Sequence, residues 1–373
     1  NYSKWYRILN YWSDRNISGP KPIPYFGNNL AHVLKFKAFV EMEWYKTYGP
    51  VFGIYECERP VLSVADPVLI KQILVKEFHK FRNRAESAER TAALGINLFM
   101  ARDGDWKRIR AIASPAFTSG KLKHMYPLIN ECCRDFLAAL DRDVSTGRRE
   151  VELKQLMIAY TRDVIATCAY SIKIDAYCGP NNPFVSKEYP FSPPNPLITL
   201  LSKMVPKWVA NNRLVKALVT GDQSDHIFFT RVAKGLMSER KKSGKKYNDF
   251  LQLLVDVERE DNNTGTMGAD SVASDALEGH HVNEGVDELM AEKQALSGVV
   301  EKTLTEEEIL SQCAVFFVAG SETTATTLSY CIYELALNPD IQDLLVAETK
   351  EAFNENTADI DYETLCRLPL LDA

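Results

Sequence analysis

A glycine, a glutamate and several threonines interrupt the longest apolar helical segment of this sequence, at residues 316–327, FFVAGSETTATT. Gly320 costs a helix interior about 1 kcal/mol relative to alanine. Threonines are weak helix formers, and a buried glutamate must be hydrogen-bonded or held neutral. Two interpretations explain why these residues, which weaken a buried helix, occur at this position.

The chemical interpretation is a dry pocket in which protons are delivered to an oxygen species. Ala319 and Gly320 leave a smooth surface on which a flat cofactor can lie. Thr323 offers a hydroxyl at a locally opened helix turn, and Glu322 relays protons from outside. The structural interpretation is that Ala319 and Gly320 allow close helix packing while Glu322 reaches solvent.

A second candidate group lies upstream, in DGDWKRIRAIA at residues 103–113. Trp106 and Arg110 are four residues apart, so a helix places both side chains on one face. The alternative is an ordinary amphipathic basic helix, which gives Trp106 no reason to lie beside the arginines.

The helix that carries the first group is predicted over residues 306–337. Thr305 and Glu308 form a capping box at its start, and Asn338 and Pro339 are interpreted as the cap and first residue of the next helix. Residues 309–320 are apolar on nearly all faces, so this helix is predicted to run buried through the middle of the domain.

In most other segments, apolar residues also recur at the three- and four-residue spacing of a helix. The predicted fold is therefore mainly α with a small β-sheet. Further helices are expected at 36–48, 104–118, 123–145, 151–170, 222–242 and 247–259. The sheet is a hairpin formed by 51–56 and 60–66, after which Asp66 caps a helix that begins at Pro67.

Composition and charge narrow the function. The 373 residues are 46% hydrophobic with a net charge of −6, which suits a globular protein and argues against a nucleic-acid surface. The 8 cysteines show no zinc or disulfide spacing and are interpreted as free buried thiols. No apolar run is long enough to span a membrane, and no signal peptide is recognisable.

Three segments depart from the helical pattern. Residues 18–29 form a Pro-rich, extended N-terminal segment. Residues 178–209 are rich in proline and aromatic side chains, so they are predicted to cap an apolar cavity or touch a membrane surface, with a plain surface loop as the alternative. Residues 261–302 have a charge of −7 and are predicted to be a solvated or disordered linker without chemistry.

These motifs, in this order, resemble those of cytochromes P450, and most closely the animal microsomal family-3-type enzymes. AGSETT at 319–324 is similar to the A/G-G-x-D/E-T-T/S signature of the long central helix, and residues 103–125 resemble the helix that carries W-x-x-x-R, matched by Trp106 and Arg110. SPAFTSGKLKHM at 114–125 and the Pro-rich 18–29 segment add to the resemblance. It covers nearly the whole chain, as a single partial domain over 1–373.

The resemblance implies a b-type haem (iron protoporphyrin IX) as cofactor. In the family, the indole and guanidinium that match Trp106 and Arg110 bond a haem propionate, a task suited to a donor-only ring and a fixed cation. The resemblance places four more residues at the haem: Phe316, Ala319, Gly320 and Thr323.

The resemblance also implies mono-oxygenation, in which one oxygen atom of O2 enters an apolar small molecule and the other leaves as water. Thr323 is expected to donate a hydrogen bond to dioxygen at the haem, and Glu322 to relay protons. Electrons would come from NADPH through NADPH-cytochrome P450 reductase, with cytochrome b5 as a second candidate partner. The implied location is the cytosolic face of the endoplasmic reticulum membrane, with an anchor helix upstream of Asn1.

Two family markers do not occur in the sequence: the E-x-x-R helix and the loop that supplies the axial cysteine thiolate. No cysteine has glycine two positions later, so the axial cysteine is expected beyond Ala373. Without that thiolate, we expect the 373-residue polypeptide to lack activity by itself. The alternatives are a truncated, non-catalytic helical protein that binds no haem and a helical interaction module that matches the motifs by chance.

Overall fold

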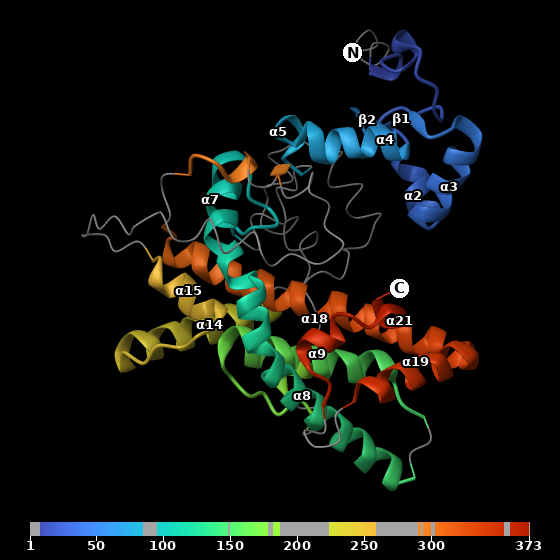
Figure 1. The fold of residues 1–373 in the computed structure, drawn as a ribbon. Coiled ribbons are helices and arrows are strands. Elements are labelled where there is room, and N and C mark those ends of the chain that lie inside the picture. The colour runs from blue at the N-terminus through green and yellow to red at the C-terminus, as the bar shows by residue number, and fades with distance from the viewer. Residues whose placement is uncertain are drawn as a thin grey trace.

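The computed structural model describes residues 8–84, 95–147, 150–177, 182–186, 224–258, 290–291, 294–299, 303–353 and 359–372. It is mainly helical with one small sheet, as the sequence predicts (Figure 1). Its helices are η1 (Ser13–Arg15), α2 (Asn29–Leu34), α3 (Lys37–Tyr48), α4 (Pro67–Lys71), the π-helical turn η2 (Gln72–Lys76), α5 (Phe78–Phe81), α7 (Asp103–Ala113), η3 (Ser114–Phe117), α8 (Ser119–Ser145), α9 (Leu153–Tyr170), α10 (Pro183–Ser186), α14 (Ser224–Ser243), α15 (Phe250–Asp256), α18 (Glu306–Leu337), α19 (Pro339–Ala352), α20 (Tyr362–Leu365) and α21 (Pro369–Asp372).

The predicted hairpin is confirmed. Strands β1 (Val51–Glu56) and β2 (Arg59–Val64) pair antiparallel, from Val51 opposite Val64 to Glu56 opposite Arg59. The Trp12 indole donates a hydrogen bond of 2.9 Å to the Ile54 carbonyl, which holds the N-terminal segment against β1. The predicted start of α4 is also confirmed, because the Asp66 carboxylate accepts from the Leu69 amide at 2.8 Å.

Helix α18 is the centre of the helical part of the molecule. It packs along α9 and also contacts α14 and α15 (Figure 1). Ile309, Cys313 and Phe317 are almost fully buried in the main hydrophobic cluster. The prediction of a long helix buried through the middle of the domain is therefore confirmed for its N-terminal half, whereas residues 330–334 are exposed.

The predictions at both ends of α18 are confirmed in position. The capping box is present, with the Glu308 amide donating to the Thr305 hydroxyl and the Thr305 amide donating to Glu308 Oε2. Asn338 is the N-cap residue of α19 and Pro339 is its first residue, as predicted. The Asn338 side chain accepts no capping hydrogen bond from α19 and instead donates to the Glu334 carbonyl at 2.8 Å, which satisfies the C-terminal end of α18.

The cysteine prediction is partly correct. None of the described cysteines forms a disulfide, but Cys331 and Cys366 are exposed rather than buried. Cys331 lies in the exposed C-terminal half of α18, where an apolar sequence was not a sufficient sign of burial.

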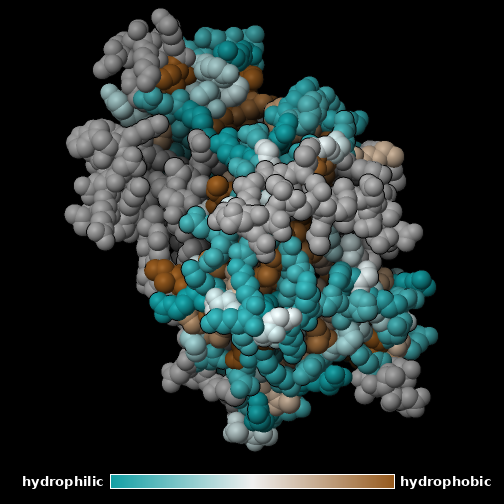
Figure 2. All heavy atoms as spheres, turned by 90° about the vertical axis from the view of Figure 1, so that its left-hand side faces the viewer, coloured by the Kyte–Doolittle hydropathy of each residue, from teal (hydrophilic) through white to brown (hydrophobic). Residues whose placement is uncertain are grey.

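The described surface agrees with the globular composition. Figure 2 shows that the face on the left of Figure 1 is mostly hydrophilic where residues are described, with apolar side chains scattered over it. No helix among the described residues is long and apolar enough to cross a membrane. Most of the two segments predicted at 178–209 and 261–302 lies outside the described residues, so their predicted roles stay predictions.

Candidate active site

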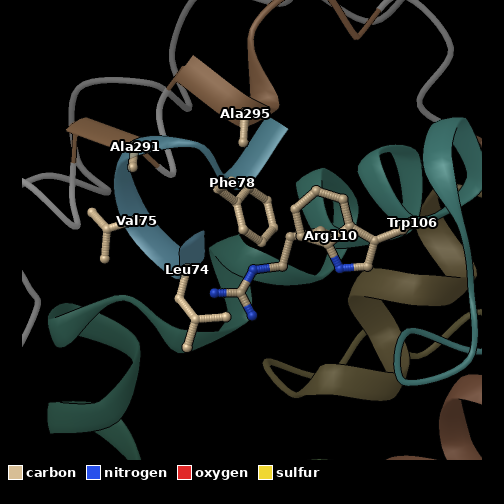
Figure 3. Close-up of a pocket in the computed structure, with 7 residues that line it drawn as sticks. All are labelled: Leu74, Val75, Phe78, Trp106, Arg110, Ala291 and Ala295. Carbon is tan, nitrogen blue, oxygen red and sulfur yellow. The ribbon is translucent and has the colours of Figure 1, made fainter. Parts of the chain in front are cut away.

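Trp106 and Arg110 of α7 line one cavity of about 220 Å³. Figure 3 shows both side chains projecting from α7 toward the same space, with Phe78 beside the indole. The centroids of the Phe78 ring and the Trp106 ring are 5.4 Å apart. The remaining lining residues are apolar: Leu74, Val75, Ala291 and Ala295.

The residues of this cavity fit one edge of a flat apolar cofactor that carries carboxylates. The Trp106 indole and the Arg110 guanidinium are donors without acceptors, so they match carboxylate oxygens. The cavity is smaller than the ~300 Å³ at the lower end of small-molecule pockets, so it suits one edge of a cofactor rather than the whole. Haem, an apolar ring with two propionates on one edge, fits this donor set.

Arg108, between these two residues on α7, connects α7 to the start of α18. Its guanidinium donates to both Glu308 carboxylate oxygens, at 2.5 and 3.1 Å, and to the Thr303 carbonyl at 2.7 Å. Both side chains of the pair are largely buried. Burial pushes the pKa of Glu308 upward, but the hydrogen bonds from Arg108 and Thr305 outweigh it and hold the pKa below its ordinary value. Glu308 thus serves the capping box and the ion pair together.

Arg108→Met is expected to lower the free energy of unfolding by about 1.5–3 kcal/mol, because Glu308 keeps its burial and loses its charged donor. The pKa of Glu308 is lower in the folded state than in the unfolded state. Its ionised carboxylate therefore stabilises the fold fully above its ordinary pKa of 4.5, and this stabilisation is lost as the pH falls through the folded-state pKa. The difference between the two proteins in urea denaturation should therefore narrow below about pH 4.5.

The control for this measurement is Asp105→Asn. Asp105 is the other, more exposed carboxylate partner of Arg108, at 3.1 Å, so its loss should change stability little. If Arg108→Met costs no more than Asp105→Asn at pH 7, the pair to Glu308 does not hold α7 against α18.

Ala319 and Thr323 lie on one exposed face of α18. The Thr323 hydroxyl donates to the Ala319 carbonyl at 2.6 Å, four residues back along the helix. The backbone is a continuous α-helix through this stretch, so the predicted locally opened turn is not present. A helix tolerates such back-bonded hydroxyls without breaking, because the carbonyl oxygen has a second lone pair.

Glu322, Gly320 and Phe316 have other surroundings. The Glu322 carboxylate pairs with Lys154 of α9 at 2.9 Å, and this hydrogen bond raises the pKa of Lys154. Gly320 faces Ile165 of α9. The Phe316 ring is half-buried and contacts the rings of Phe117 and Phe250, with centroids 5.5 and 4.3 Å away. None of these contacts excludes the predicted cofactor roles, which stay predictions.

The comparison with protein families decides the identity of the fold. A family model described as cytochrome P450 matches residues 17–373. The chain belongs to the cytochrome P450 family.

Similar P450 proteins occur in insects and vertebrates. The chain is 32% identical to cytochrome P450 6B7 of Helicoverpa armigera over 375 residues, which cover 100% of this chain and 68% of the relative. It is 31% identical to cytochrome P450 6k1 of Blattella germanica, over 97% of this chain and 66% of the relative. It is 33% identical to cytochrome P450 3A7 of Homo sapiens, over 95% of this chain and 64% of the relative. The chain therefore spans about two thirds of the length of these curated relatives.

In this P450 chain, the predicted site residues form two separate groups. Trp106 and Arg110 share the α7 cavity, whereas Ala319 and Thr323 share an outer face of α18 and do not line that cavity. Arg108 and Lys154 were not predicted as site residues, because their acidic partners are far away in the sequence. Residues 261–302 were predicted to be a linker without chemistry, but Ala291 and Ala295 form part of the cavity wall. No local pattern signals these contacts.

Proposed function

We propose that this protein is a haem-dependent mono-oxygenase that inserts one oxygen atom from O2 into apolar small molecules. Electrons come from NADPH through NADPH-cytochrome P450 reductase, with cytochrome b5 as a second candidate donor. The site of action is the cytosolic face of the endoplasmic reticulum membrane. The observation that carries the proposal is the shared cavity of Trp106 and Arg110 in a chain of the P450 family. Family membership does not favour the non-catalytic alternative.

The residues of α7 hold the cofactor by its acidic edge. Trp106 and Arg110 would donate hydrogen bonds to propionate oxygens, and the apolar side chains around them would contact the ring. The haem, when bound, supplies the iron that activates dioxygen.

The residues of α18 manage protons. The Thr323 hydroxyl has one proton, which it donates to Ala319 now, so it must turn outward before it can donate to a reacting oxygen. Its lone pairs can meanwhile accept from water. Glu322 lies one residue earlier, half-exposed and paired with Lys154, so it can exchange protons with solvent and pass them inward through water.

Thr323→Ala tests this function in the haem-loaded full-length protein, which carries the axial cysteine expected beyond Ala373, supplied with reductase, NADPH and ¹⁸O2. The wild-type protein is expected to give a product with one ¹⁸O atom. Losing one hydrogen bond of about 1 kcal/mol should lower product per NADPH consumed roughly five- to tenfold, since water partly replaces the hydroxyl.

The matched control is Thr327→Ala, one helical turn further along α18, where the hydroxyl donates to the Thr323 carbonyl at 3.1 Å. This variant should form as much product per NADPH consumed as the wild-type protein. Equal ratios for Thr323→Ala and wild type would remove Thr323 from the mechanism. A full-length wild-type protein that forms no ¹⁸O-labelled product from any apolar compound would refute the function itself.

A further inference from the structure

Helices α18 and α9 approach each other closely at Gly320. A Cβ atom added to Gly320 would lie 2.8 Å from Cδ1 and 3.1 Å from Cγ1 of Ile165 on α9. Carbon atoms in contact are normally about 3.5–4.0 Å apart, so an alanine here collides with Ile165 in its present position. The missing side chain of Gly320 therefore points at a neighbouring helix.

Two buried hydroxyls of α9 bind the backbone of α18 on either side of this contact. The Tyr170 hydroxyl donates to the Cys313 carbonyl at 2.7 Å. The Thr161 hydroxyl lies 3.0 Å from the Ser321 carbonyl and 2.9 Å from the Met157 carbonyl of its own helix, and these two acceptors share its one proton. Tyr170 and Ser321 are almost fully buried. Hydrogen bonds between buried groups resist displacement, because breaking one leaves an unsatisfied polar atom. α18 is thus held at two points eight residues apart.

These contacts fix the rotation of α18 about its own axis. With the Gly320 side of the helix held against α9, Ala319 and Thr323 come to lie on the outer face. A rotation of α18 would move both residues away from that face. Lys154, also on α9, pairs with Glu322 on the same stretch of α18.

We propose that Ile165, Thr161 and Tyr170 of α9 are positioning residues that set the orientation of Thr323, and that Gly320 is needed for this helix contact rather than for contact with a cofactor. The link to Thr323 rests on the proposed function, whereas the packing role of Gly320 does not.

The packing role is tested by thermal unfolding of four forms of the chain: wild type, Gly320→Ala, Ile165→Ala and the double variant. Gly320→Ala should lower the midpoint by a few degrees, because the collision outweighs the better helix propensity of alanine. In the Ile165→Ala background only Cβ remains, at an ordinary 3.6 Å, so Gly320→Ala should raise the midpoint. The same shift in both backgrounds would overturn the packing role.

Gly235→Ala is the matched control. Gly235 lies inside α14 with nothing within 4 Å of an added Cβ, so alanine there should raise the midpoint in both backgrounds.

The positioning role is tested by product formed per NADPH consumed in the haem-loaded full-length protein, which carries the axial cysteine expected beyond Ala373. Gly320→Ala should lower this ratio, and adding Ile165→Ala should restore it toward wild type. If the ratio stays low in the double variant while its thermal midpoint recovers, Gly320 contacts the cofactor and the positioning role is refuted. If the midpoints behave as expected but Thr323→Ala has no effect on the ratio, Thr323 has no part in the mechanism and the positioning role falls, whereas the packing role stands.

Discussion

Arg240→Met is expected to lower the free energy of unfolding by about 3–5 kcal/mol, which is a large part of a domain's stability. The Arg240 guanidinium makes two hydrogen bonds of 2.7 Å to the Asp249 carboxylate, and both side chains are nearly inaccessible to solvent, at 5% and 2% exposure. Removing the arginine leaves an uncompensated buried carboxylate. It also removes a donor from the Tyr170 carbonyl, which Arg240 reaches at 2.8 Å.

This pair matters for the site because it joins the helices that hold α18. Arg240 lies on α14, Asp249 caps α15 by accepting from the Gln252 amide, and Tyr170 ends α9. All three helices contact α18. Loss of the pair should therefore loosen the helices that position the central helix.

The loss of stability is measured by urea denaturation, with Lys246→Met as the control. The variants are compared at the same dependence of the unfolding free energy on urea concentration. Lys246 pairs with Asp256 at 2.9 Å, but its side chain is 75% exposed, so its removal should cost under about 1 kcal/mol. Arg240→Met combined with Asp249→Asn should recover part of the loss, since the amide is neutral and can still cap α15. A cost for Arg240→Met no greater than that for Lys246→Met would contradict this account.

Local signals in the sequence were sufficient to predict most of the described fold. The α18 boundaries follow from Thr305 and Glu308 at one end and Pro339 just beyond the other, because capping and proline act within a few residues. The hairpin and the start of α4 follow from similarly local chemistry. The Asn338 side chain bonds α18 rather than α19, because the C-terminal carbonyls of α18 and the N-terminal amides of α19 compete for one side chain.

The candidate site was predicted only where its residues share a helix face. Trp106 and Arg110 are one turn apart, so spacing alone placed them together. The partners of Arg108 and Lys154 lie on other helices, and the choice between several nearby carboxylates depends on packing that no local pattern encodes. The contact between Gly320 and Ile165 is of the same kind, because it depends on how two helices cross.

Replacing both Trp106 and Arg110 is expected to weaken haem binding about a hundredfold or more. Each residue offers a donor to a propionate in a cavity with apolar walls, and a hydrogen bond to a charged group contributes about 1.5–3 kcal/mol. Two such bonds correspond to a factor of at least about 10² in affinity. Trp106→Phe with Arg110→Met keeps the apolar contacts of both side chains and removes both donors.

The matched control is Arg142→Met, which removes an exposed arginine from the end of α8 without touching the cavity. It carries the same charge change as Arg110→Met. A simple loss of positive charge would therefore weaken haem binding in the control as well.

The most direct measurement of the central claim is a haemin titration of the purified protein and these variants, followed by the intense absorption band of bound haem. The account predicts that Arg142→Met binds haemin like the wild type, while Trp106→Phe with Arg110→Met binds it at least about a hundredfold more weakly. Haemin affinity equal to wild type in the double variant would show that the α7 cavity does not hold the cofactor.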